Sequence, residues 1–67
     1  MISVFINGVV KELEQPVSVA ELIQKMELGG KRIALERNGE IVPRSLFSQQ
    51  LLADGDQLEI VIAVGGG

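Results

Sequence analysis

The chain has 67 residues, 46% of them apolar, and a formal net charge of −3, so we expect one small folded domain rather than a disordered chain. Its six basic residues are scattered along the sequence, which argues against nucleic-acid binding, because a phosphate backbone is bound by concentrated positive charge. Cysteine and histidine are both absent, which removes disulfides, thiolate nucleophiles, histidine bases and the usual zinc ligands.

The apolar runs are also short. A membrane-spanning helix needs about 20 consecutive apolar residues, and no run in this sequence approaches that length. The lack of cysteine fits a reducing compartment, so we expect a cytoplasmic protein that binds neither membrane nor nucleic acid. Without disulfides or a metal, so short a chain has to be stabilised by dense packing.

Residues 2–13 have the pattern of a β-hairpin. Apolar and more polar side chains alternate from Ile2 to Ile6, which is the period of a half-buried strand. Asn7-Gly8 supplies residue types that tolerate positive φ in a tight turn, and the alternation continues on the return strand. Lys11 falls on the apolar parity, so we expect its aliphatic stem to lie along a sheet edge.

A helix is predicted to begin directly after Ser18. Ser18 is a suitable N-cap, and Glu21 three residues later completes a capping box. Val17 and Leu22 have the spacing of a hydrophobic staple across the same turn. Apolar residues at helical spacing then predict a helix of about ten residues with one buried face, with Gly29 suited to a left-handed C-cap.

The second half of the chain has three further patterns. Residues 33–36 alternate as a strand, and Asn38-Gly39 predicts a second hairpin whose short return strand stops at Pro43. The segment 44–53 has no clean period and predicts a short helical turn or an ordered loop. A turn at residues 54–56 then leads into a last alternating strand.

This order of elements predicts an α+β fold in which one main helix covers one face of a mixed sheet of four to five strands. A last strand that follows such a crossover lies most simply beside the first strand, in parallel, at the centre of the sheet. That is the ubiquitin-like β-grasp arrangement. We expect the folded domain to span residues 1–64 and residues 65–67 to form a flexible C-terminal glycine tail.

A candidate docking patch follows from the parity of the two strands expected at the centre. Phe5, Val61 and Ala63 would lie on the sheet face that the helix leaves uncovered, near the tail. Ile41 or Val42 would extend this patch toward a partner protein. The alternative is that these are ordinary scattered apolar side chains of a protein surface.

The glycines of residues 65–67 follow the last strand with no polar linker. Glycine has no Cβ, so this backbone is thin enough to enter a channel that no other residue fits. Fully extended, the three residues reach about 10 Å beyond the folded body. A frayed end is the plain alternative, but the placement favours an arm that presents a C-terminal carboxylate.

The stretch from Asn38 to Arg44, the stretch from Asp54 to Val61 and the terminal glycines together resemble the ThiS family, the sulfur carrier proteins of thiamine biosynthesis. The first hairpin and the capped helix start fit as well, so the resemblance covers essentially the whole chain. One segment departs from the family pattern. Residues 45–48 stand where a Trp often falls in the family, and Phe47 can fill the same apolar role.

The resemblance implies a carrier that partner enzymes act on, not an enzyme. In the family, an E1-like adenylyltransferase uses ATP and Mg²⁺ to adenylate the C-terminal glycine carboxylate. Sulfur from a cysteine desulfurase relay converts it to a thiocarboxylate, which donates the sulfur to thiazole synthase. Carried over to this chain, Gly67 bears the reactive carbonyl and Gly66 completes the terminal Gly-Gly. The chain itself is expected to bind no cofactor and no metal.

Four other functions remain open from the sequence. The small subunit of molybdopterin synthase has the same fold and the same terminal thiocarboxylate. A ubiquitin-like modifier would form amide links to lysines, and a plain β-grasp interaction domain would leave its glycines inert. A hidden enzyme is the weakest alternative, because the acidic residues are expected at strand-surface and turn positions with solvated structural roles: Glu36, Glu40, Asp54, Asp56 and Glu59.

Overall fold

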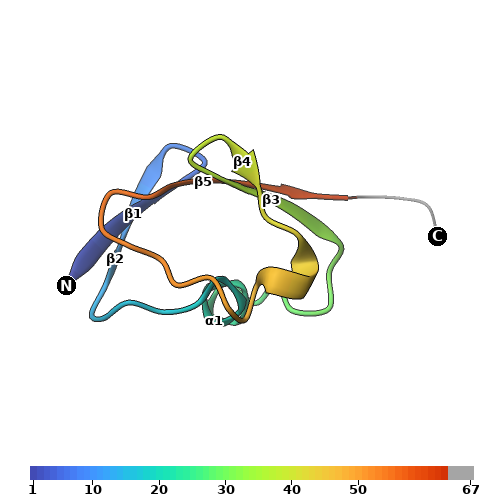
Figure 1. Cartoon of the computed structure of the whole chain (residues 1–67), viewed down its shortest axis with the longest axis horizontal. Coiled ribbons are helices and arrows are strands. Elements are labelled where there is room, and N and C mark those ends of the chain that lie inside the picture. Colours follow the sequence, from blue (N-terminus) through green and yellow to red (C-terminus); the bar gives the residue numbers. More distant parts are fainter. Residues whose placement is uncertain (64–67) are drawn as a thin grey trace.

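The computed structural model describes residues 1–63, and in this part of the chain a five-stranded sheet is packed against one α-helix (Figure 1). The expected boundary at residue 64 and the tail of residues 65–67 lie outside the described residues. The elements are β1 (Ile2–Ile6), β2 (Val9–Leu13), α1 (Val19–Lys25), β3 (Ile33–Arg37), β4 (Glu40–Ile41), the 3-10 turn η1 (Arg44–Leu46) and β5 (Gln57–Ile62).

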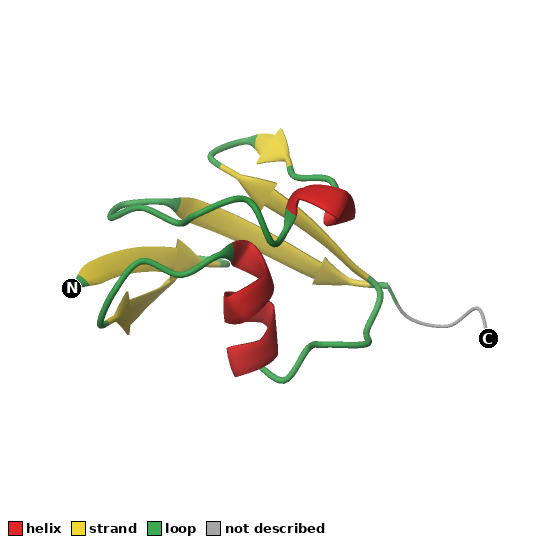
Figure 2. Cartoon of the chain, turned by 60° about the horizontal axis from the view of Figure 1, so that its bottom comes forward, coloured by secondary structure: helices red, strands yellow, loops and turns green. Residues whose placement is uncertain are grey.

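The strands lie in the order β2-β1-β5-β3-β4. β1 and β5 are parallel neighbours, with Phe5 opposite Gln57 and Ile6 opposite Leu58, whereas the other neighbouring strands are antiparallel. Parallel neighbours need a crossover connection, and here it includes α1, which lies across one face of the sheet (Figure 2). The predicted β-grasp architecture is therefore confirmed.

The hydrophobic core lies between α1 and the sheet. The alternation along β1 and β5 turns Val4, Ile6, Leu58 and Ile60 toward α1, and each of these side chains is at most 8% exposed. Leu22 meets them from the helix and is fully buried, and burying one such leucine contributes roughly 1.5–3 kcal/mol. The side chains between these positions lie on the opposite side of the sheet, which we call the outer face.

The edge strand β2 contributes less to this core than its alternation predicted. Leu13 is buried, but Val9 and Lys11 on the same parity are exposed, because β2 is the outermost strand on its side of the sheet. The expectation that Lys11 lies at a sheet edge is confirmed. At the opposite edge, the short β4 ends the sheet.

Both predicted Asn-Gly turns are present, and their asparagines also hold the central strand. Asn7 and Asn38 have φ values of 50° and 52°, which asparagine tolerates better than most residues. The Asn7 side chain accepts a hydrogen bond from the Ile60 amide (2.8 Å) and donates one to the Ile60 carbonyl (3.1 Å). The Asn38 Oδ1 accepts from the Gln57 amide at 2.9 Å. Each hairpin tip is thereby fastened to β5.

The start of α1 agrees with the sequence. Ser18 Oγ accepts a hydrogen bond from the Glu21 amide at 3.1 Å, and Glu21 Oε1 accepts one from the Ser18 amide at 3.2 Å. Both residues of the predicted staple, Val17 and Leu22, are buried. The capping box is therefore confirmed.

We expect Ser18→Ala to lower the free energy of unfolding by roughly 1 kcal/mol, because the Glu21 amide loses its acceptor. Chemical denaturation of the variant and the wild-type chain measures this difference. Ser48→Ala, at an exposed serine of the loop after η1, serves as the control and should leave the midpoint in place. An unchanged midpoint in Ser18→Ala would contradict the capping role.

The end of α1 differs from the prediction. The helix stops at Lys25, and Glu27 rather than Gly29 takes the left-handed conformation, with a φ of 59°. The Glu27 amide donates to the Gln24 carbonyl, and the Leu28 amide donates to the Ile23 carbonyl, which together form a Schellman motif. Leu28 packs against the core, and this apolar contact after the left-handed residue explains the early stop.

The segment between η1 and β5 is an ordered loop, as predicted. Phe47 and Leu52 are buried and anchor it, whereas Leu51 is 62% exposed. Carbonyl groups of this loop accept hydrogen bonds from the Val19 and Ala20 amides at the start of α1. The loop therefore satisfies backbone donors that the first helical turn leaves free.

Candidate functional site

The candidate site is the end of β5, from which the chain continues toward Gly67. The Ala63 amide donates a hydrogen bond to the Arg32 carbonyl at 2.8 Å, so the chain is held to the start of β3 as far as Ala63. The predicted sulfur-bearing residues Gly66 and Gly67 lie outside the described residues. Their role stays a prediction, and the structure describes the surface from which they extend.

Apolar residues and arginines meet at this point. Val61 on β5 lies directly opposite Ala34 on β3, and Val61 is 64% exposed on the outer face. A shallow recess is lined by both residues together with Ala63, Arg32 and Arg44. We call these five residues the tail-exit surface. It joins segments from three parts of the chain: the start of β3, η1 and the end of β5.

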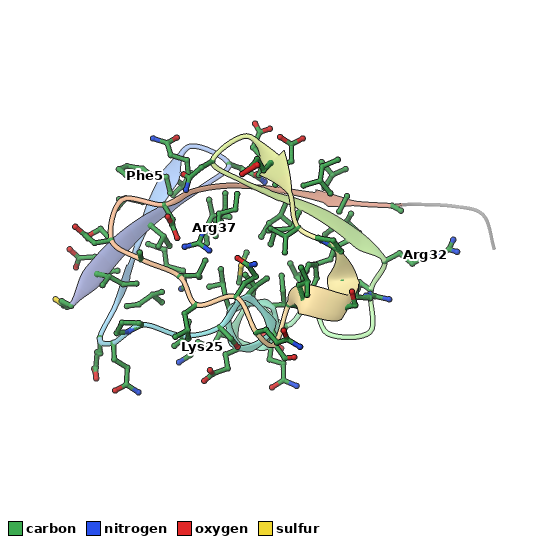
Figure 3. All side chains as sticks on the ribbon, viewed as in Figure 1. Phe5, Lys25, Arg32 and Arg37 are labelled. Carbon is green, nitrogen blue, oxygen red and sulfur yellow. The ribbon has the colours of Figure 1, made fainter. Side chains whose placement is uncertain are left out.

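The two arginines are placed differently. Arg44 donates from Nη2 to the Lys31 carbonyl at 2.7 Å, which links η1 to the loop before β3. Arg32 is exposed at the end of the molecule where β5 finishes, and it points away from the sheet (Figure 3). Guanidinium groups match carboxylates and phosphates in shape and charge, so this end of the surface is suited to an acidic group.

Phe5 does not join this surface, although it was predicted to. It is on the outer face, but it lies opposite Gln57, four residues before Val61 on β5, which corresponds to about 13 Å along a strand. Phe5 and Arg32 accordingly lie at opposite ends of the molecule (Figure 3). Strand parity predicted the correct face, but the register separates Phe5 from Val61 and Ala63.

The two other predicted docking residues have opposite environments. Ile41 is 74% exposed and lies opposite Glu36 on the outer face. Val42 is 8% exposed and belongs to the core, and its amide donates to the Leu35 carbonyl. Including Val42 in the docking patch was wrong, because neighbouring residues of an extended segment point to opposite faces and only Ile41 points outward.

Two glutamates occupy the outer face between Phe5 and Val61. Glu59 on β5 lies directly opposite Glu36 on β3, one alternation step from the pair formed by Val61 and Ala34. Glu59 is exposed and Glu36 is partly buried. The sequence predicted both as strand-surface positions, but their direct opposition depends on the register of β3 against β5.

Asp56 was expected to be solvated in a turn, and this was wrong. Its side chain is 8% exposed and forms an ion pair with Arg37 at 2.8 Å. Burial raises the pKa of the Asp56 carboxyl, but hydrogen bonds from the Ala53 amide, Asn38 and Arg37, with the Arg37 charge, outweigh it and lower the pKa below its usual value. This network joins the start of β5 to the β3–β4 turn, so its role is structural.

Within residues 1–63, no three acidic side chains are grouped so that they could hold a metal ion. None of the helices formed by these residues has both the length and the apolar character needed to cross a membrane.

Comparison with known proteins identifies the family. The ThiS family model matches residues 4–67. The sulfur carrier protein ThiS of Bacillus subtilis (strain 168) is 36% identical over 50 residues, covering 75% of this chain and 76% of that protein. A crystal structure of the thiamine biosynthesis protein ThiS from Geobacter metallireducens has a TM-score of 0.83 and 26% identity, covering 98% of this chain and all of that one.

A further relative is longer. A thiazole synthase of Paramagnetospirillum magneticum (strain ATCC 700264 / AMB-1) is 40% identical over 62 residues, which is 92% of this chain but 19% of that protein. This chain therefore spans about a fifth of that relative. The family match, the relatives and the shared fold agree with the resemblance seen in the sequence: the chain belongs to the ThiS family of sulfur carriers in thiamine biosynthesis.

Proposed function

We propose that this chain carries sulfur for thiazole formation in thiamine biosynthesis and that Gly67 bears the sulfur as a thiocarboxylate. The single observation that carries this proposal is the family match, which extends over residues 4–67 and so includes the terminal glycines. The tail-exit surface supports it, because β5 is held to the sheet up to Ala63 and leads directly into those glycines.

The proposed chemistry begins at the Gly67 carboxylate, which is ionised at neutral pH like other α-carboxyl groups. One of its oxygens attacks the α-phosphorus of ATP on an E1-like adenylyltransferase, which forms an acyl-adenylate and releases pyrophosphate. A persulfide sulfur supplied by a cysteine desulfurase relay then attacks the carbonyl carbon and displaces AMP, and a thiol reduces the resulting acyl disulfide, which leaves the thiocarboxylate on Gly67. Glycine has no side chain to hinder either approach.

In this proposal the chain is a co-substrate and its partners are the enzymes. ATP and Mg²⁺ are bound by the adenylyltransferase, which neutralises the phosphates and sets the in-line geometry. This domain contributes the surface that the partner enzyme recognises and the terminal residues that extend to the enzyme's active site. The Asp56–Arg37 ion pair belongs to the fold rather than to this chemistry.

Thiazole synthase is the acceptor that the relatives favour over molybdopterin synthase. In the Paramagnetospirillum thiazole synthase, a segment of about a fifth of the protein is similar to nearly all of this chain. A carrier-like segment in the same polypeptide as the synthase would raise the effective concentration of the sulfur donor at its acceptor. By analogy, we assign a thiazole synthase as the sulfur acceptor of this chain.

Intact-mass analysis of the chain purified from its own cells tests the proposal. We expect a fraction in which one oxygen has been replaced by one sulfur, located at Gly67 by fragmentation, and we expect this fraction to grow in cells that lack thiazole synthase. Deleting the gene should create a requirement for thiamine while molybdoenzymes stay active. Protein with no sulfur at Gly67 in cells that lack thiazole synthase would contradict the proposal.

A further inference from the structure

Charges near the end of β5 change sign along the sheet. Arg32 and Arg44 lie beside Ala63, at the end where the chain continues to Gly67. The apolar pair of Ala34 and Val61 comes next, followed by a pair of glutamates. One alternation step on a strand is about 7 Å, so a basic, an apolar and an acidic zone succeed one another within a short distance.

The acidic zone is unfavourable for the isolated domain. Glu36 and Glu59 lie directly opposite each other in an antiparallel ladder, where like charges are destabilising. The adjacent cation, Arg37, turns to the other face, where it pairs with Asp56 at 2.8 Å. The outer-face residue on the other side of Glu36 is the exposed apolar Ile41. The register therefore opposes two like charges, and none of their outer-face neighbours Ala34, Val61 and Ile41 is a cation.

The proposed function places a partner on this surface. Gly67 is four residues beyond Ala63, and four extended residues span at most about 14 Å. An adenylyltransferase that acts on Gly67 must bring its active site within that distance of Ala63. Protein interfaces of standard size bury about 800 Å² on each partner, so the docked enzyme covers the tail-exit surface and the neighbouring glutamates.

Resting on that function, we propose that the outer face docks an adenylyltransferase surface of opposite polarity: acidic beside Arg32 and Arg44, apolar over Val61, and basic over Glu36 and Glu59. A basic side chain of the enzyme between the two glutamates removes the repulsion present in the free domain. The order of the charges also fixes the orientation in which the carrier docks. A carrier rotated by half a turn about its terminal segment would place like charges of the two proteins opposite each other.

Glu59→Gln separates this role from a structural one. The variant loses one of two repelling charges, so its denaturation midpoint should rise, while its docking should weaken. In ATP–pyrophosphate exchange with the cognate adenylyltransferase at low salt, we expect the KM for the carrier to rise about threefold to tenfold with kcat unchanged. Glu12→Gln is the matched control, because Glu12 is an exposed glutamate on the outer face of the distant β2.

A second variant tests the basic zone. Arg32→Glu changes an exposed side chain and should raise the KM for the carrier at least as much as Glu59→Gln. Lys11→Glu on β2 is its control and should match the wild type. Added salt should raise the KM of the wild-type chain more than that of either docking variant, because fewer opposite charges remain to be screened.

The outcomes distinguish this inference from the proposed function. If the wild-type chain supports exchange and both docking variants have its KM, the carrier function stands and the polarity of the docking surface is overturned. A fall in the denaturation midpoint of Glu59→Gln would also overturn it, since the glutamate would then be stabilising the fold. If the wild-type chain supports no exchange, the proposed function itself fails.

Discussion

Removal of Gly67 is expected to abolish adenylation while leaving the domain folded. The truncated chain ends at Gly66, so its carboxylate starts from a position one residue, or about 3.5 Å, nearer the domain. A misplacement of 1 Å can cost about 100-fold in rate when the reacting atoms have to be held in line. We therefore expect exchange of ATP with pyrophosphate to fall by at least about 100-fold in kcat/KM.

Two controls distinguish a C-terminal carboxylate that is too short to reach the adenylyltransferase active site from a domain that has lost its fold. The denaturation midpoint of the truncated chain should equal that of the wild type, because Gly67 is four residues beyond Ala63, whose amide donates a hydrogen bond to the Arg32 carbonyl just before β3. Gly67→Ala keeps the length of the chain and adds one methyl group, so it should retain more activity than the truncation. Wild-type exchange by the truncated chain would refute Gly67 as the acylated residue.

Loss of the Asp56 carboxylate is expected to destabilise the fold strongly. Asp56 accepts hydrogen bonds from the Ala53 amide, Asn38 and Arg37, and its side chain is 8% exposed. Breaking a buried pair costs roughly 3–5 kcal/mol, and the partial exposure of Arg37 (23%) favours the lower end. Asp56→Ala should therefore remove about 3 kcal/mol, a large share of the roughly 5 kcal/mol typical of such small domains.

Asp54→Ala is the matched control, because Asp54 lies in the same turn but is exposed and accepts one hydrogen bond, from the Ser3 amide at 2.7 Å. The pH dependence gives a second readout. Since the pKa of Asp56 is lowered by folding, its stabilisation is complete above the ordinary aspartate pKa of about 3.9 and is lost as the pH falls through the lower folded value. Asp56→Ala should lack this loss. Equal stability of the two alanine variants would show that the Arg37 pair does not hold the fold.

On the outer face, the stability of the isolated domain and its recognition by a partner favour different residues. A domain that only had to fold would not place Glu59 opposite Glu36, because a neutral residue at either position removes the repulsion. A carrier that has to dock on its partner in one orientation gains specificity from fixed charges around its terminal segment. A stabilising substitution that weakens recognition is the expected sign of this conflict.

Local patterns in the sequence were sufficient for the order and type of the elements. The alternation at residues 2–6, the two Asn-Gly turns and the capping box of Ser18 with Glu21 each depend on neighbours within a few residues, and all are present. The family resemblance also came from short stretches and named the two terminal glycines. Both glycines lie outside the described residues, and their role rests on the family.

The set of elements, the face of the sheet on which the residues of β1, β3 and β5 lie, and the family all follow from the sequence alone. Tertiary structure decided which of these residues meet: the register of β5 against β1 keeps Phe5 from Val61, and the register of β3 against β5 sets Glu36 opposite Glu59. It also decided that Asp56 finds Arg37, nineteen residues away in the chain. Parity is a property of one strand, whereas register and ion pairing are properties of segments that only folding brings together.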